Sequence, residues 1–228
     1  MRNKILYLLG IAGVAWLARN LYIIFLGLPD EAAQGAIYRI MYFHVPSWWT
    51  CFAAYFVSGV AGVMYLVKKN QDYDALAVAS VEVGVAFTLI GLATGSIWAR
   101  IIWGIWWTWD ARLTWALITC LVYAGYLMLR RAVDEPTTRA RFAAVFGAFA
   151  FTTVAITWKS IEWWRTQHPG PVISFRTGGG NMDPAMENML FSNWGAVGLI
   201  AIVLIAVRMR QEQHLRLIEA LRRQVHTL

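Results

Sequence analysis

Six blocks of mainly apolar residues, each roughly 20 residues long, alternate with short polar segments along the chain. The blocks cover residues 5–28, 46–67, 75–98, 113–129, 139–158 and 190–208. About 20 helical residues cross the hydrocarbon core of a bilayer, and lipid offers no hydrogen-bond partner to free backbone groups. The pattern therefore predicts an all-α, polytopic membrane protein with six transmembrane helices in one domain.

The composition supports a membrane protein. Hydrophobic residues make up 59% of the 228 residues and charged residues 14%, whereas an average soluble domain is about 25% charged. The first apolar block runs past the length of a signal peptide and lacks a small-residue cleavage site, so we expect it to remain as a span. Cys51 and Cys120 lie inside apolar blocks. They are interpreted as buried hydrophobic residues and not as a disulfide or a metal pair.

The basic residues predict the orientation. The net charge is +7, and thirteen Lys and Arg residues lie in the N-terminus, the second and fourth loops and the C-terminal tail. The first, third and fifth loops and their flanks carry six, which are Arg39, Arg100, Arg112, Lys159, Arg165 and Arg176. The positive-inside rule then places both termini in the cytoplasm. The basic tail, residues 209–228, is either a continued helix at the membrane surface or against a partner, or a solvated segment.

The tryptophans are unevenly distributed between the two predicted faces. Of the 13 tryptophans, all but Trp16 fall at the outward ends of the spans or in the outward loops. An ordinary aromatic belt populates both membrane interfaces. The asymmetry therefore indicates a large, flat, apolar ligand on the outer face.

The outward segment 98–115 contains the candidate platform for that ligand, formed by Trp103, Trp106, Trp107, Trp109, Asp110 and Arg112. If the segment is helical, Trp103, Trp106, Trp107 and Asp110 share one face. Each indole carries an N–H that needs a partner, which a ligand carboxylate can supply. We expect Asp110 and Arg112 to fix the loop by hydrogen bonds. The alternative is a helix that only anchors the protein at the membrane interface.

Two of the four histidines, His44 and His168, are expected in outward loops, before the second and the sixth span. Pro46 is expected to end any preceding helix and to suit the first turn of the next. A histidine pair beside a tryptophan-rich surface suits axial ligation of a haem iron, whereas zinc usually takes three or four protein ligands. The haem is expected to be non-covalent, because no C-x-x-C-H motif occurs. Its propionates suit outward arginines, although each can instead pair with Asp110, Glu162 or a headgroup.

Two other functions remain as alternatives. A b-type haem electron carrier needs histidines that face each other inside the spans, and none of the predicted spans contains one. A haem transporter or permease needs intramembrane polar groups, for which the spans offer mainly Arg19 and Glu82. No G-x-x-x-x-G-K-[ST] motif occurs, so the chain is not predicted to be an ATPase, and any ATP-driven step belongs to a partner.

The run from Trp103 to Thr114 resembles the tryptophan-rich WWD signature of haem-handling proteins. Two further segments resemble those that flank this signature in the CcmC family: F-H-V-P at 43–46, and E-W-W with His168 at 162–168. The length, the six spans and the placement of the three motifs agree with that family along nearly the whole chain. The resemblance implies cytochrome c maturation in the bacterial inner membrane. His44 and His168 would then be axial ligands that hold haem transiently at the periplasmic side, with the run 103–114 as its platform.

The same resemblance implies partners. Members of the CcmC family promote covalent attachment of haem to the chaperone CcmE. They associate with the CcmA–CcmB ABC transporter and the small subunit CcmD. The fifth loop, residues 169–188, matches no motif of the family, so the resemblance assigns it no contact with CcmE.

Overall fold

The computed structural model describes residues 2–170 and 182–226, so Arg176 lies outside the described residues. The helices are α1 (Arg2–Tyr22), α2 (Met41–Lys68), α3 (Gln71–Trp103), α4 (Ala111–Ala132), α5 (Pro136–Trp163) and α6 (Pro184–His226). A π-helical turn, Ile23–Gly27, extends α1, and a 3-10 helix, Ala36–Ile40, leads into α2. Six stretches of helix in the described chain are long and apolar enough to cross a membrane. The predicted all-α class with six spans is confirmed.

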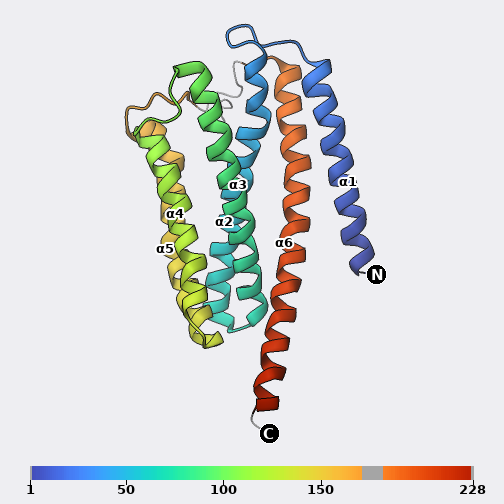
Figure 1. Ribbon diagram of the computed structural model, residues 1–228, viewed down its shortest axis with the longest axis vertical. Coiled ribbons are helices and arrows are strands. Elements are labelled where there is room, and N and C mark those ends of the chain that lie inside the picture. The colour runs from blue at the N-terminus through green and yellow to red at the C-terminus, as the bar shows by residue number, and fades with distance from the viewer. Residues whose placement is uncertain (1, 171–181, 227–228) are drawn as a thin grey trace.

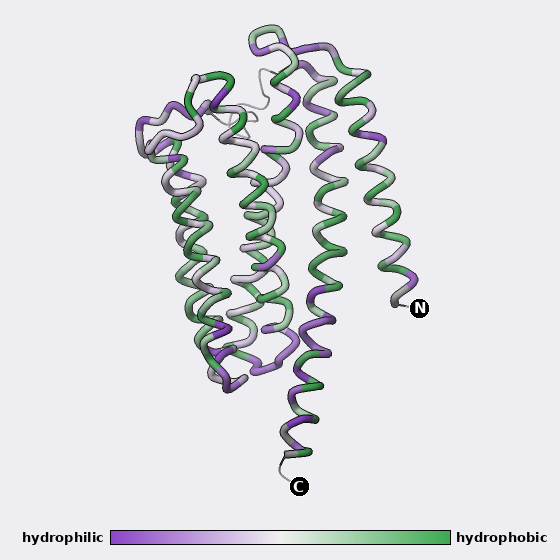
Figure 2. The backbone as a smooth tube through the Cα atoms, viewed as in Figure 1, coloured by the Kyte–Doolittle hydropathy of each residue, from purple (hydrophilic) through white to green (hydrophobic). Residues whose placement is uncertain are grey.

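The helices run up and down between two ends of a bundle (Figure 1). We call the end where α3 and α5 finish and α2, α4 and α6 begin the site end, and the opposite end, beyond which α6 projects, the tail end. Helices α2, α3, α4 and α5 pack together, α6 lies against α2 and α3, and α1 packs mainly against α6. Figure 2 shows a largely apolar band between polar ends, and the tail-end part of α6 is mostly polar. The site is therefore carried by the four-helix group and the connections at its site end.

Side-chain caps define where several helices begin. Asn70, Asp110 and Glu135 each accept a hydrogen bond from a backbone N–H in the first turn of α3, α4 and α5. Such caps satisfy donors that have no partner within the helix. At the other end of α3, Gly104 has φ 77° and stops the helix after Trp103. Glycine adopts this left-handed conformation without the steric cost that a Cβ brings.

Glycines on one face of α3 allow α2 to approach closely. A Cβ added at Gly84, Gly91 or Gly95 would lie 2.6–2.8 Å from the ring of an aromatic or histidine side chain of α2. The three positions are seven and four residues apart, which places them on one helical face. Small residues let membrane helices pack with their backbones near each other. This packing fixes the α2 rings that reach the site end.

Pro46 lies inside α2 and does not precede it. Proline removes the backbone hydrogen bond to the carbonyl four residues earlier, which here is that of Tyr42. Asn193 of α6 donates its side-chain N–H to this carbonyl at 2.6 Å. Asn193 is itself fully buried. The helix thus continues through Pro46 because another helix supplies the missing donor, as expected where no water is present.

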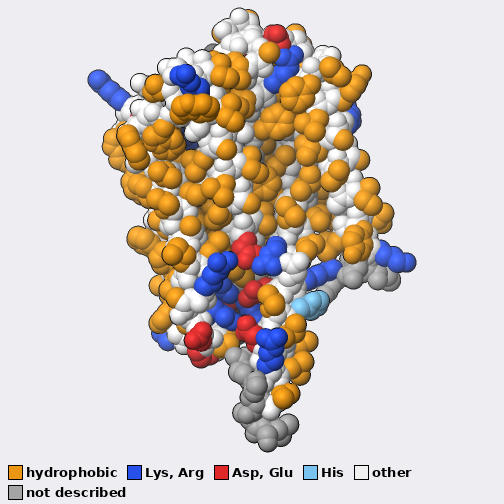
Figure 3. All heavy atoms as spheres, in the orientation of Figure 1, with side chains coloured by type: hydrophobic (Ala, Val, Ile, Leu, Met, Phe, Trp, Pro, Cys, Tyr) orange, Lys and Arg blue, Asp and Glu red, His pale blue; other side chains and the backbone are white. Residues whose placement is uncertain are grey.

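The C-terminal segment 209–226 continues α6 as a helix, one of the two structures expected for it. Near its start it is tied to the bundle by charges. Arg130 of α4 forms a two-pronged ion pair with buried Asp74 of α3, at 2.6 and 3.0 Å, and Arg216 of α6 contacts the same carboxylate at 2.5 Å. Figure 3 shows Lys, Arg, Asp and Glu side chains gathered below the apolar band. Removing one member of such a buried cluster leaves an unpaired charge, which costs about 3–5 kcal/mol.

Candidate functional site

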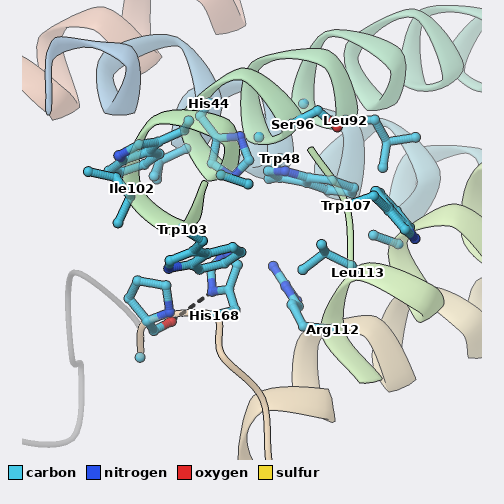
Figure 4. Close-up of a pocket in the computed structure, with 18 of the residues that line it drawn as sticks. His44, Trp48, Leu92, Ser96, Ile102, Trp103, Trp107, Arg112, Leu113 and His168 are labelled. Carbon is cyan, nitrogen blue, oxygen red and sulfur yellow. Dashed lines mark hydrogen bonds between the residues drawn. The ribbon is translucent and has the colours of Figure 1, made fainter. Parts of the chain in front are cut away.

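A cavity of about 120 Å³ opens at the site end between α2, α3, α4 and the connection that follows α5. Its lining includes four tryptophans, two histidines and one arginine. These residues are His44, Trp48, Trp98, Trp103, Trp107, Arg112 and His168. Figure 4 shows His44 and Trp48 on one side of the cavity and His168 and Arg112 on the other. The predicted histidine pair and part of the predicted platform therefore meet in one cavity.

His44 belongs to the first turns of α2, so the expectation that it lies in a loop before the helix is wrong. Its ring lies 3.1 Å, through Nδ1, from the hydroxyl oxygen of Thr94 on α3. Thr94 donates its single hydroxyl proton to the carbonyl of Ile90 at 2.7 Å, so towards His44 it acts as an acceptor. Nδ1 of His44 is then the protonated nitrogen, and Nε2 carries a free lone pair.

In His168, as in His44, Nδ1 is the ring nitrogen that forms a hydrogen bond. Its Nδ1 lies 2.7 Å from the carbonyl oxygen of Pro169, the contact drawn as a dashed line in Figure 4. A carbonyl only accepts, so Nδ1 donates and Nε2 is unprotonated. Burial, and secondarily the charge of Arg112, lowers the pKa of His168 to about 4, against the opposing effects of the Pro169 carbonyl and Asp110. The ring is neutral near pH 7, as a metal ligand must be.

The two rings have a spacing that suits one shared metal ion. Their centroids are 6.4 Å apart and their planes differ by 31°. Two metal–nitrogen bonds of about 2 Å each put rings that share one metal about 6 Å apart, centre to centre. The described residues contain no group of three or more His, Cys, Asp or Glu side chains arranged to hold a metal ion. Two neutral imidazoles without further protein ligands fit haem iron, whose other four ligands come from the porphyrin.

The predicted platform is not a helix between its two ends, because α3 stops at Trp103 and α4 starts at Ala111. Trp103 and Trp107 line the cavity. Trp106 and Trp109 are not among the lining residues, and they are 59% and 75% exposed. The left-handed turn at Gly104 redirects the chain, so spacing based on a continuous helix does not apply. Two tryptophans of the platform thus face the cavity, and two face outward.

Asp110 connects the platform to His168. One carboxylate oxygen caps α4 by accepting from the backbone N–H of Leu113 at 2.9 Å. The other accepts from the hydroxyl of Thr166 at 2.7 Å and from the backbone N–H of Gln167 at 3.1 Å. The Thr166 hydroxyl oxygen accepts in turn from the backbone N–H of His168 at 3.0 Å. Asp110 therefore positions the segment that presents His168, rather than lining the cavity.

Arg112 is the charged group of the cavity. It donates to the backbone carbonyl of Thr157, and its guanidinium lies 5.8 Å from the ring centre of Trp48. Among the residues that the structure describes, no carboxylate forms an ion pair with it. The buried Nε1 of Trp107 has no hydrogen-bond partner either. A half-buried cation and a buried N–H without acidic partners suit a ligand that carries carboxylates.

Several functional contacts were not predicted from the sequence. Trp48, outside the predicted platform segment 98–115, lines the cavity together with Trp98, the first residue of that segment. The ring of His44 lies edge-on to both, with centroids 6.3 and 5.9 Å apart. Gly95 gives His44 its space, because an added Cβ would lie 2.8 Å from the Cε1 atom of the ring. The spacing of Gly91 and Gly95 on one helical face was the available signal for this close approach.

The intramembrane charges are paired away from the cavity. Glu82 binds Arg208 of α6 at 2.5 and 2.8 Å, and Arg19 donates to the side chain of its neighbour Asn20. These groups do not line the cavity at the site end. His168 lies in the connection after α5, so the histidine pair is not held between two spans. Both features disfavour the electron-carrier and permease alternatives.

Comparison with known proteins gives a consistent family. The model of a family described as "Heme exporter protein C" matches residues 1–224. A protein of that name from Bradyrhizobium diazoefficiens is 38% identical over 99% of this chain and 82% of its own length. The protein of that name from Escherichia coli K12 is 34% identical over 80% of this chain and 73% of its own length. A Marchantia polymorpha protein named as a putative cytochrome c biosynthesis ccmC-like mitochondrial protein is 31% identical over 72% of this chain and 71% of its own length.

Proposed function

Because the chain belongs to the haem exporter protein C family, we propose that it binds haem between His44 and His168 and presents it for transfer. It is a multi-pass membrane protein of the Ccm haem exporter system, with a role in haem handling for cytochrome c biogenesis. In this proposal haem is the cargo. It is bound non-covalently, as a b-type haem, and only until it is passed on.

The observation that carries the proposal is the arrangement of the two imidazoles. Their centroids are 6.4 Å apart, and each ring has Nδ1 engaged by an oxygen and Nε2 free. Histidines that ligate metals commonly donate their other ring N–H to a carbonyl or a similar acceptor, which fixes the tautomer. Both Nε2 atoms can thus bind iron without a proton having to leave.

The remaining lining supports the rest of the haem. Trp48, Trp98, Trp103 and Trp107 supply apolar surface for the porphyrin. Arg112 and the unpaired N–H of Trp107 supply a cation and a donor for the propionates. The cavity volume of about 120 Å³ is below the roughly 300–1,000 Å³ typical of ligand pockets. Only part of a haem is enclosed by it, which suits a protein that hands its cargo to another.

In this proposal the site end lies at the periplasmic face of the bacterial inner membrane and both termini lie in the cytoplasm, which the charge distribution supports. There the exposed Trp106 and Trp109 (59% and 75%) offer an apolar surface beside the cavity. The receiving protein in this proposal is the haem chaperone CcmE, which takes haem covalently. The CcmA–CcmB ABC transporter and CcmD act as partners, and any ATP-driven step is theirs.

The test is the visible absorption spectrum of the purified protein and of His44→Ala and His168→Ala. The parent is expected to show a low-spin haem spectrum, and each variant is expected to lose haem or become high-spin. His214→Ala is the matched control, because His214 lies in the tail-end part of α6, away from the cavity. An unchanged low-spin spectrum in both variants would contradict the assignment of the axial ligands.

Transfer is tested separately by mixing the haem-loaded protein with haem-free CcmE. A presentation protein is expected to lose haem to CcmE, whereas an electron carrier retains it and only changes redox state. Retention of haem in the presence of competent CcmE would favour the electron-carrier alternative.

A further inference from the structure

A second cavity lies between α1 and α6, towards the tail end and away from the histidine pair. Its volume is about 770 Å³, within the roughly 300–1,000 Å³ of pockets that hold sizeable ligands. Apolar side chains such as Leu6, Ile11, Val14 and Val203 form most of its walls. The polar residues Arg210, Gln211 and His214 lie on the α6 wall at its tail-end limit.

The cavity is a wedge-like groove that widens towards the tail end, and its α1 wall extends past Gly13 to Ala18. The two helices touch nearer the site end, where a Cβ added at Gly13 would lie 3.0 Å from Ile200 and one added at Gly10 would lie 3.7 Å from Val203. From there they diverge towards the N-terminus of α1 (Figure 1). A helix of a partner subunit would fit this groove poorly, because a transmembrane helix is about 10 Å wide along its whole length. A phospholipid, with a broad headgroup and flexible chains, matches a wedge that is wide at the membrane surface and narrow inside.

The basic residues at the wide end of the groove favour a lipid with an anionic headgroup. Arg210 and His214 stand on the α6 wall, and Lys4 on α1 lies one turn before Tyr7, which lines the opposite wall. The orientation predicted from the basic residues places this end in the cytoplasmic leaflet, where anionic lipids meet basic clefts between helices. Both walls of the groove therefore place hydrogen-bond donors at the depth of the lipid phosphates.

We propose that the groove between α1 and α6 is a binding site for an anionic phospholipid of the cytoplasmic leaflet. The acyl chains fill the apolar wedge, and the phosphate contacts Arg210, with Gln211 and His214 beside it. Such a lipid adds contacts between α1 and α6, the helix on which α1 mainly packs. The site is separate from the haem cavity, and it does not depend on the function proposed for that cavity.

Native mass spectrometry of the full chain tests the proposal after delipidation and addition of phosphatidylglycerol, cardiolipin or phosphatidylcholine. The parent is expected to retain one phosphatidylglycerol or cardiolipin in preference to phosphatidylcholine. Arg210→Gln is expected to weaken that retention about fivefold, the contribution of one arginine near an anionic lipid. Ala15→Phe, which puts a ring into the groove, is expected to abolish it.

Two matched variants serve as controls. Arg222→Gln removes the same charge further along α6, and Ala12→Phe adds the same ring to α1 at a position outside the groove. Both are expected to bind lipid as the parent does. Equal retention by Arg210→Gln and the parent would overturn the proposal, as would equal retention of phosphatidylcholine. A protein subunit found in place of lipid on the undelipidated chain would also overturn it.

Discussion

His44 and His168 reach the same chemical state through different neighbours. On α2, a threonine hydroxyl that already donates its proton elsewhere accepts from Nδ1 of His44. In the connection after α5, the next residue's carbonyl accepts from Nδ1 of His168. Each contact fixes one tautomer and leaves Nε2 free. The two side chains are pre-organised as ligands, and the cost of ordering them is met in folding rather than in binding.

The conservative substitution Asp110→Asn separates the two tasks of this side chain. The amide oxygen still caps α4, but the amide nitrogen cannot accept from the Thr166 hydroxyl or the Gln167 backbone N–H. The segment that presents His168 then loses its anchor, while the cavity lining is intact. We expect haem affinity to fall about tenfold or more, as for other residues that orient metal ligands, measured by haem titration with the visible spectrum.

Glu135→Gln is the control for this change. Glu135 caps α5 with its carboxylate in the same way, at the opposite end of the bundle. Its substitution is expected to change haem affinity little. If Asp110→Asn and Glu135→Gln behave alike, the link between Asp110 and His168 has no functional role.

At the scale of single residues, the sequence predicted the two candidate iron ligands but not the residues that orient them. The two histidines were predicted as a pair because their residue type is rare in the chain and both flank spans on one face. Thr94 and Thr166, which orient them, are ordinary threonines in the sequence. Their roles arise from contacts between segments about 50 residues apart, such as Thr94 with His44 and Thr166 with Asp110. Such contacts leave no local pattern to interpret.

Among the helices, α3 sets the precision of the site through its glycine face. The ring of His44 occupies the space beside Gly95, and the ring of Trp48 that beside Gly91. These residues place the cavity lining on α2 against a rigid helix instead of a loop. A site built on regular elements holds its geometry more closely than one built on connections.

The substitution Gly95→Ala tests this contact. The added methyl would lie 2.8 Å from His44, so the ring must move. Overpacking of this kind lowers the free energy of unfolding by about 1–3 kcal/mol. The displaced imidazole is then poorly oriented to bind the iron. We expect a lower melting temperature and a partly high-spin spectrum. Gly198→Ala is the control, because nothing lies within 4 Å of an added Cβ at that position; it is expected to keep the parent spectrum. A parent spectrum in Gly95→Ala would show that the ring has room.

Hydropathy predicted the helices well because each must bury its own backbone groups in lipid. The helical spacing considered for the platform does not hold, because the chain bends at Gly104, where φ is 77°. The start of the second span predicted at Pro46 is too late, because α2 begins at Met41 and continues through the proline. Asn193, far away in the sequence, allows the helix to pass through that proline by pairing with the Tyr42 carbonyl.

In the whole molecule, the two ends of the bundle differ in chemistry. The site end carries aromatic rings, the histidine pair and few cations, whereas the tail end carries the buried cluster of Asp74, Arg130 and Arg216. That cluster joins α3, α4 and α6 at the end where the basic loops lie. Haem presentation at the periplasmic face and the choice of a cytoplasmic-leaflet lipid for the groove both depend on which end of the bundle faces the cytoplasm. The charge asymmetry predicts that it is the tail end.

Single cysteines at the two ends test this orientation. Ala32→Cys lies in an exposed turn at the site end, and Asp134→Cys in the exposed connection between α4 and α5 at the tail end. Both native cysteines, Cys51 and Cys120, are buried, so they leave a low background for a membrane-impermeant maleimide. In intact spheroplasts we expect labelling at position 32 only, with labelling at 134 after permeabilisation. The reverse pattern would place the histidine pair in the cytoplasm, where haem could not be presented to a periplasmic acceptor.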